Sequence, residues 1–120
     1  MRIATSLILS IAFCSFAHAA FAHATLTRSS PADGERLAAP RAFTLQFSEG
    51  LESAFSHMTV SASSGGPVGL TNERVSGDGD NVLSASPSRP LPPGNYTIRW
   101  DVLSKDGHKT GGTRSFTVTP

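Results

Sequence analysis

The chain has 120 residues, with ten lysines and arginines against nine aspartates and glutamates, four histidines and one cysteine. Its length suits one domain, and the balanced charge leaves no basic surplus of the kind that proteins binding nucleic acid or anionic lipid carry. A single cysteine excludes a framework of disulfides within the chain.

Residues 1–22 have the pattern of a secretory signal peptide. Arg2 supplies a positive start, an apolar run extends from Ile3 to about Phe16, and small residues follow. The run is shorter than the ~20 residues that a membrane-spanning helix needs, which favours a cleaved leader over an anchor. Loss of the leader would remove Cys14 and leave nine basic against nine acidic residues, with no thiolate for a metal site.

Two cleavage points fit the requirement for small residues at positions −3 and −1. Ala20-Phe21-Ala22 would release a chain that starts at His23, and Ala17-His18-Ala19 would release one that starts at Ala20. The leader alone does not decide between them. The choice matters because a histidine at the amino terminus has chemistry that an internal histidine lacks.

After the leader, apolar and polar residues alternate over short runs. In the clearest run, residues 95–102, Tyr96, Ile98 and Trp100 share one face. Period-two alternation indicates half-buried strands, and the Gly, Pro, Asp and Asn between the runs indicate turns. No segment of helical length shows a 3.6-residue period. The pattern predicts an all-β sandwich of about seven strands. Runs of this kind lie at residues 43–47, 58–62, 81–85, 95–102 and 113–119.

The aromatic residues of the domain are the predicted anchors of its core, because large apolar side chains dominate core packing. They are Phe43, Phe47, Phe55, Tyr96, Trp100 and Phe116. Met58 is interpreted as a packing residue and His57 as a surface residue, since adjacent residues of a strand face opposite ways.

His23 would be a good copper ligand if it began the chain. A terminal α-amine and an imidazole have ordinary pKa values of about 8 and about 6.5, so both can be unprotonated near neutrality. The amine nitrogen and Nδ1 would close a six-membered chelate on one ion, whereas an internal histidine offers only an amide nitrogen. Nitrogen donors in a tetragonal arrangement favour Cu(II). The ordinary alternative for His23 is a frayed terminal residue.

Asp106-Gly107-His108 is the second candidate for metal binding. An aspartate and a histidine two positions apart lie on the same side of an extended segment, and the glycine lets the chain bend so that both reach one ion. With His23 they would supply an amine, two imidazoles and a carboxylate, a donor set suited to Cu(II). The same tripeptide is also a serviceable turn, in which the aspartate bonds to nearby backbone.

Glu49 is a third candidate. It continues the parity of Phe43, Leu45 and Phe47, so it is expected at the inward edge of their strand. A carboxylate there needs a partner. The partner would be a metal ion, a hydrogen bond to one of its ligands or a salt bridge to an arginine.

Several short segments stand in a characteristic order along residues 23–120. They are His23-Ala24-Thr25-Leu26, Ser30-Pro31-Ala32-Asp33-Gly34, Leu45-Gln46-Phe47-Ser48-Glu49, the run from Leu91 to Trp100, Ser104-Lys105-Asp106-Gly107-His108 and Phe116-Thr117-Val118. In this order and spacing they resemble the CopC-type periplasmic copper-resistance domain.

The resemblance implies a cupredoxin-like or immunoglobulin-like β-sandwich with Greek-key connections. It implies a mature chain that begins at His23, so residues 1–22 are expected to be the cleaved signal peptide and residues 23–120 a copper-binding domain in the periplasm. It also implies one Cu(II) bound by the amine and imidazole of His23, by Asp106 and by His108, with Glu49 near the metal. The implied partner is a CopD-like copper-transport protein of the inner membrane.

One segment departs from the family pattern. Val60–Pro67 contains neither methionine nor histidine, where some members have a methionine-rich stretch that holds Cu(I). Cu(I) prefers soft sulfur ligands, so no Cu(I) site is expected. The protein is expected to be a non-enzymatic Cu(II) protein that sequesters the ion or delivers it.

Three other interpretations remain open at this point. An amino-terminal histidine with a second histidine also describes the histidine brace of copper oxygenases, although Asp106 would favour Cu(II) and oppose reduction. The chain could instead be a β-sandwich interaction module with incidental histidines, which would bind no stoichiometric copper. Zinc also accepts His and Asp ligands, although copper outcompetes it at equal availability.

Overall fold

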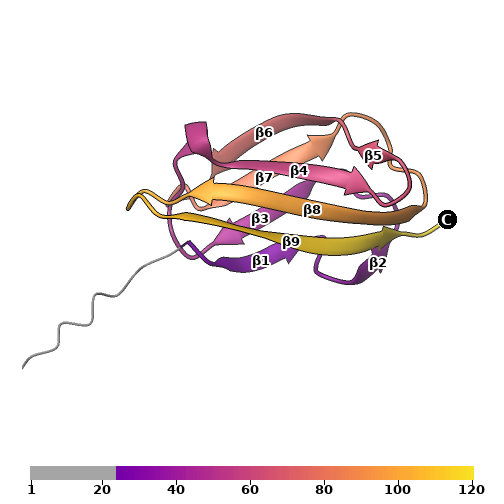
Figure 1. Ribbon diagram of the computed structural model, residues 1–120, viewed down its shortest axis with the longest axis horizontal. Coiled ribbons are helices and arrows are strands. Elements are labelled where there is room, and N and C mark those ends of the chain that lie inside the picture. The colour runs from indigo at the N-terminus through magenta and orange to yellow at the C-terminus, as the bar shows by residue number, and fades with distance from the viewer. Residues whose placement is uncertain (1–23) are drawn as a thin grey trace, which may run out of the picture.

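The computed structural model describes residues 24–120, and both the predicted signal peptide and His23 lie outside them. Nine strands and one 3-10 turn make up this part of the chain (Figure 1). They are β1 (Leu26–Ser30), β2 (Glu35–Leu37), β3 (Phe43–Phe47), η1 (Ser53–Phe55), β4 (His57–Ala62), β5 (Gly66–Pro67), β6 (Leu70–Ser76), β7 (Val82–Pro87), β8 (Gly94–Leu103) and β9 (Lys109–Val118).

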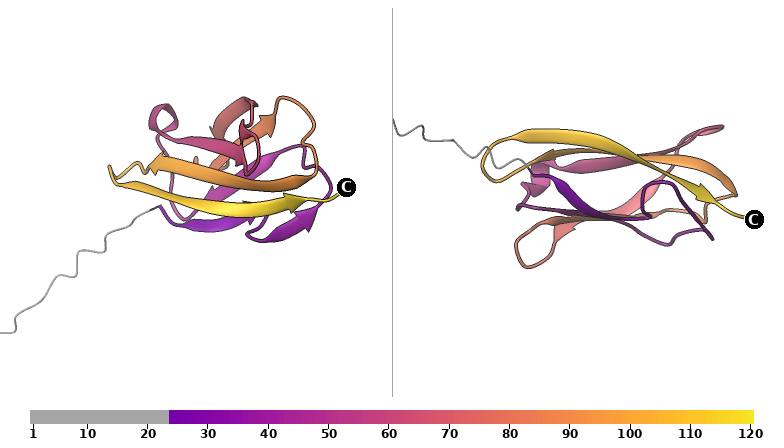
Figure 2. Two further views of the ribbon diagram at one scale, coloured as in Figure 1. Left: turned by 45° about the vertical axis from the view of Figure 1, so that its right-hand side comes forward. Right: turned by 90° about the horizontal axis from the view of Figure 1, so that it is seen from below.

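The strands form two sheets that pack face to face, as the view from below in Figure 2 shows. One sheet has the order β1-β3-β7-β6 and the other the order β2-β9-β8-β4-β5. Most connections cross from one sheet to the other, whereas β8 and β9 follow each other as a long antiparallel hairpin. This is the sandwich that the alternating sequence predicted. β2 has three residues and β5 has two, so seven longer strands carry the fold.

The core lies between the sheets because alternate residues of the central strands face inward. Phe43, Leu45 and Phe47 of β3 are buried, with polar residues between them. On the facing sheet, Trp100 meets Phe47 edge-on with ring centroids 6.3 Å apart. Tyr96 stacks on Phe116 of β9 at 5.3 Å. The aromatic anchors are thus confirmed at these positions.

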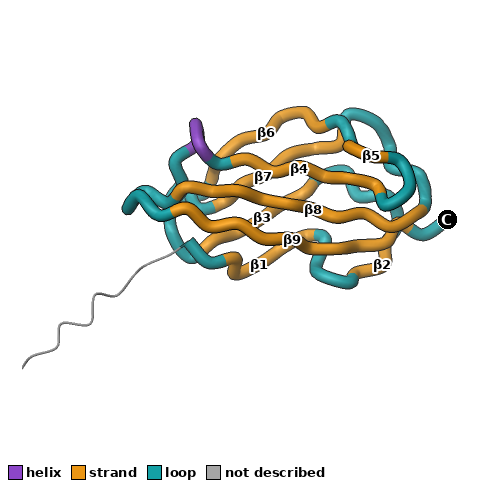
Figure 3. Tube along the Cα trace, viewed as in Figure 1, coloured by secondary structure: helices purple, strands orange, loops and turns teal. Residues whose placement is uncertain are grey.

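Phe55 is the exception among the predicted anchors, because 63% of it is exposed. It ends η1, a single turn that lies outside the two sheets (Figure 3). The sequence offered no signal for this turn, since the run before β4 is too short to show a helical period. The prediction for the next pair was correct: Met58 is buried and His57 is exposed.

Loops gather at the two ends of the sandwich (Figure 3). Within residues 24–120, the structure contains no helix with the length and apolar character needed to cross a bilayer. The end that concerns function is the one where β8 turns into β9.

Candidate metal centre

The turn between β8 and β9 brings Asp106 and His108 together. His108 Nδ1 lies 3.1 Å from Asp106 Oδ1. Gly107 between them has φ 91°, a left-handed conformation that glycine adopts without strain. Its N–H donates to the carbonyl of Ser104 at 2.9 Å. The tripeptide is therefore a turn, and the turn brings an imidazole nitrogen and a carboxylate oxygen next to each other.

Ser104 organises this pair, although the sequence gave no reason to single it out. Its side chain is fully buried, and its hydroxyl donates to the carboxylate of Asp106. The same oxygen accepts the N–H of His108 at 3.3 Å. The Ser104 hydroxyl, followed by the side chain and N–H of His108, holds the pKa of Asp106 below its ordinary value, although partial desolvation opposes them. These contacts favour the ionised form of the Asp106 carboxylate and fix its orientation.

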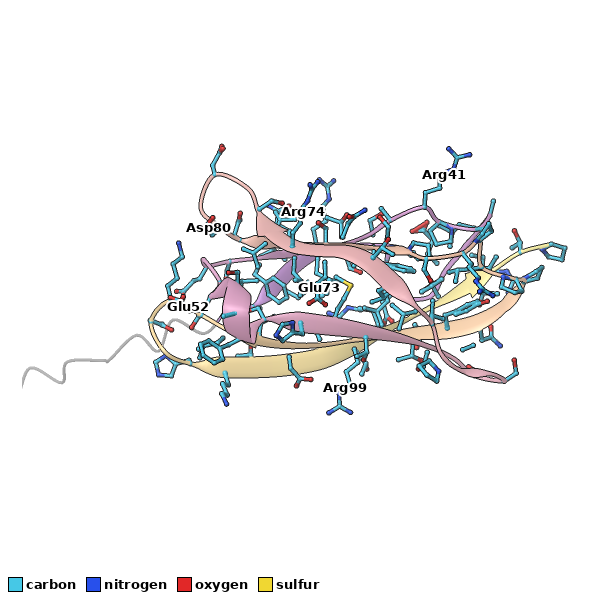
Figure 4. The ribbon with its side chains drawn as sticks, turned by 90° about the horizontal axis from the view of Figure 1, so that it is seen from above. Arg41, Glu52, Glu73, Arg74, Asp80 and Arg99 are labelled. Carbon is cyan, nitrogen blue, oxygen red and sulfur yellow. The ribbon has the colours of Figure 1, made fainter. Side chains whose placement is uncertain are left out.

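A neighbouring segment, residues 49–52, braces the turn. The N–H of Lys105 donates to the carbonyl of Gly50 at 3.0 Å, and Leu51 forms a β-bridge with Ser104. Gly50 is packed tightly at this position, because a Cβ there would lie 2.6 Å from the carbonyl oxygen of Gly79 and 3.1 Å from Cδ of Lys105. The Lys105 ammonium also pairs with Asp80, which Figure 4 shows at the same end of the sandwich as Glu52.

Glu49 is the first residue of this bracing segment, but it does not lie where strand parity placed it. β3 ends at Phe47, so Glu49 lies in the bend that follows, half-buried rather than on the inward face of a strand. Among residues 24–120, no ion pair joins it to an arginine. In that part of the chain no three His, Cys, Asp or Glu side chains gather as a metal-binding group. The described residues thus bring together two of the predicted ligands, Asp106 and His108.

The residues that follow position 23 are anchored close to this pair. Ala24 is buried, with 3% of its surface exposed. Its carbonyl accepts a hydrogen bond of 2.9 Å from the hydroxyl of Thr110, the second residue of β9. Thr25 exchanges two bonds with Ser48: its N–H donates to the Ser48 hydroxyl at 2.9 Å, and its carbonyl accepts the Ser48 N–H at 2.8 Å. Neither Thr110 nor Ser48 carried a recognisable signal in the sequence.

Comparison with known proteins places the chain among copper proteins. The CopC domain profile matches residues 26–119. Protein YobA of Escherichia coli (strain K12) is 37% identical over 96 residues, which cover 79% of this chain and 77% of that protein. Copper resistance protein C of Pseudomonas syringae pv. tomato is 36% identical over 99 residues, which cover 78% of each.

A solved structure shares the backbone arrangement. The crystal structure of PcoC, a methionine-rich copper resistance protein from Escherichia coli, superposes with a TM-score of 0.73 at 32% identity, over 82% of this chain and 100% of that one. The present chain is not methionine-rich, since Met58 is the only methionine in residues 24–120. Because the profile match runs from the first strand to the end of the last, this chain belongs to the CopC domain family, and it is a copper-handling protein.

Proposed function

We propose that this CopC-family protein binds one Cu(II) in the periplasm through the amine and imidazole of His23, the carboxylate of Asp106 and the imidazole of His108. It then sequesters the ion or delivers it to a CopD-like protein of the inner membrane. Glu49 supplies a neighbouring carboxylate, since Gly50 beside it accepts the N–H of Lys105, the residue that precedes Asp106. Cu(I) is not expected to bind tightly, because the domain offers a single thioether, which is buried.

The observation that carries this proposal is the anchored backbone of Ala24. Consecutive Cα atoms lie 3.8 Å apart across a trans peptide. A chain that begins at residue 23 therefore has its amine one residue from a carbonyl that is bonded to Thr110. Thr110 lies two positions beyond His108 on the same stretch of chain. We therefore expect the amine and imidazole of an amino-terminal His23 to be able to reach the Asp106–His108 turn.

The spacing of Asp106 and His108 also suits one ion. Metal bonds of about 2.0–2.1 Å to imidazole nitrogen and carboxylate oxygen place two neighbouring donors about 3 Å apart. The 3.1 Å between His108 Nδ1 and Asp106 Oδ1 matches that separation. Three nitrogens with one carboxylate oxygen form the tetragonal N/O set that Cu(II) favours, and Cu(II) stands at the top of the divalent affinity series.

The decisive experiment is a Cu(II) titration with electron paramagnetic resonance on two purified chains. One begins at His23, and the other has a single extra alanine before it. We expect tight one-to-one binding and a nitrogen-rich tetragonal spectrum for the first chain, and much weaker binding for the second, because the extra residue converts the amine into an amide. Equal binding by both chains would overturn the role of the amine. Preference for Zn(II) over Cu(II) at equal concentration would overturn the choice of metal.

The export step has its own test. The full chain is expressed in a Gram-negative host, and its periplasmic fraction is collected. Amino-terminal sequencing of that fraction should begin at His23. If the sequence begins at Ala20 instead, His23 is an internal residue without a free amine, and the proposed site is wrong.

A further inference from the structure

We infer that Thr110 is a positioning residue for the amino-terminal copper ligand: its hydroxyl holds the Ala24 carbonyl and so fixes where the terminal amine lies relative to His108. The inference rests on the proposed function, because it gives Thr110 a role only if His23 begins the mature chain and binds copper. Thr110 itself does not contact the ion.

The geometry places Thr110 between two parts of the site that are far apart in sequence. The Thr110 hydroxyl and the Ala24 carbonyl are 2.9 Å apart and 86 residues apart along the chain. Thr110 is half-buried and stands opposite Val102 in the β8–β9 hairpin. Val102 is a core residue, with 2% exposed. The hydroxyl is thus carried by a rigid pair of strands rather than by a mobile loop.

The Ala24 carbonyl lies before the regular pairing of its own strand. The ladder between β1 and β3 begins with Leu26 and Phe47. A backbone carbonyl in a partly buried position needs a donor, and the Thr110 hydroxyl supplies it. The buried methyl group of Ala24 and the paired backbone of Thr25 hold the following peptide units.

This arrangement lowers the cost of assembling the copper site. Terminal residues are poorly ordered unless they are tied down, and ordering them at the moment of binding weakens the affinity for the ligand. With Ala24 held, only the torsions on either side of the residue 23–24 peptide remain to place the amine. Without the Thr110 hydroxyl, part of this ordering would have to occur when copper binds. The Cu(II) affinity should then fall by about three- to tenfold, the effect expected for the loss of one net hydrogen bond.

The test compares three variants of the chain that begins at His23. Thr110→Val removes the hydroxyl at nearly constant shape, Thr110→Ser keeps it, and Thr113→Val makes the same chemical change at an exposed threonine of β9. Cu(II) dissociation constants are measured by competition with a chelator. We expect Thr110→Val to weaken binding by about three- to tenfold, and Thr110→Ser and Thr113→Val to stay within twofold of the parent.

A double-mutant cycle separates positioning from general damage to the fold. Thr110→Val is combined with the extra alanine before His23. If Thr110 acts by placing the amine, the substitution should have little further effect in the extended chain, where no amine stands at that position. An equal loss in both chains would show a merely structural role and overturn the inference.

The same cycle distinguishes failure of the inference from failure of the proposed function. If the extra alanine weakens copper binding and Thr110→Val does not, the amine is a ligand and Thr110 does not position it. If the extra alanine has no effect on Cu(II) binding, the amine is not a ligand, and both the proposed site and the role of Thr110 are overturned.

Discussion

His57 and Glu73 join the two sheets across one open side of the sandwich. His57 Nδ1 on β4 lies 2.6 Å from Oε1 of Glu73 on β6, whose Oε2 accepts the N–H of Met58 at 3.0 Å. Figure 4 shows Glu73 between the strands, whereas Arg74 points away from them. β6 is the edge strand of its sheet. β5 pairs only with Ser61 and Ala62 of β4, so it does not reach Met58. The Glu73 carboxylate therefore satisfies a backbone N–H of β4 beyond the end of β5 and links the two sheets there.

This contact predicts a pH dependence of folding stability. His57 Nε2 faces the carbonyl of Ala54 at 3.2 Å, so both ring nitrogens face acceptors, and only the protonated imidazole can donate to both. The hydrogen bond to Glu73 is the main cause that raises the pKa of His57 above its ordinary value. The hydrogen bond to the Ala54 carbonyl and the negative charge of Glu73 raise this pKa further, whereas desolvation lowers it by less than the hydrogen bond to Glu73 raises it. A group whose pKa is raised by folding stabilises the protein fully below its unfolded pKa, and this stabilisation is lost as pH rises through the folded pKa.

Urea denaturation of the metal-free protein between pH 5 and pH 9 tests this prediction. The parent should lose up to about 1 kcal/mol more than Glu73→Gln as pH rises, a small value because His57 is largely exposed. Comparison with Glu73→Gln isolates this pair, since all other ionisable groups are the same in the two proteins. Parallel pH profiles for the two proteins would contradict the prediction.

Gly112 and Trp100 predict a compensating pair of substitutions. A Cβ at Gly112 would lie 2.5 Å from Cζ2 of Trp100, so Gly112→Ala should destabilise the fold by about 1–3 kcal/mol through overpacking. Phenylalanine lacks the atoms that clash. Gly112→Ala should therefore cost less in a Trp100→Phe background, and thermal unfolding of the four proteins would show it. Equal costs in both backgrounds would mean that the backbone of β9, not the indole, resists the methyl group.

His108 and Trp100 should have opposite effects when each is truncated. His108→Ala should weaken Cu(II) binding by more than about 100-fold, beyond what loss of a supporting residue does, and leave stability within about 1 kcal/mol because the side chain is partly exposed. Trp100→Ala should cost about 3–5 kcal/mol of folding free energy. The matched control is His57→Ala, which removes a histidine outside the proposed site and should leave copper affinity unchanged. Equal loss from both histidine variants would contradict the assignment.

The pH dependence of the apparent Cu(II) affinity should report how many nitrogen donors bind the ion at the proposed site. Metal binding requires the terminal amine and both imidazoles to be unprotonated. Each donor nitrogen that has to lose a proton before it binds the ion adds about one to the fall in the logarithm of the apparent Cu(II) affinity for each pH unit, so with three such donors the slope in acid should approach about three. Chelator competition between pH 5 and pH 6 measures this slope. A slope near two would mean that one of the three nitrogens does not bind the ion.

The sequence predicted the strands that have one buried and one exposed face, and it missed the strands in which most residues on both faces are exposed. β3 coincides with its predicted range, and β8 extends the predicted run by one residue at each end. β1 and β6 lie at sheet edges, where most residues are exposed, so their sequences show no alternation. Phe55 was expected in the core because its side chain is large and apolar, but the turn η1 exposes it to solvent.

The site shows the same division. Asp106 and His108 were recognisable because two donors and a glycine stand within one short segment. Ser104 and Thr110 were not, because a threonine or serine that holds a distant carbonyl or a nearby carboxylate looks like any other polar residue until the chain is folded. Glu49 was assigned to an inward position by counting along a strand, and the count stopped being valid where β3 ended at Phe47.

The β8–β9 hairpin has a consequence for how the metal comes and goes. Ten consecutive residue pairs join the two strands, from Gly94 and Val118 to Leu103 and Lys109, and the Asp106–His108 turn caps this ladder. Local openings of a protein avoid its most extensively bonded elements. If copper binds at this turn as proposed, the ion would enter and leave at the tip of the hairpin without any opening of the β8–β9 ladder. If the proposed site is correct, the protein would take up and release the ion without unfolding in between.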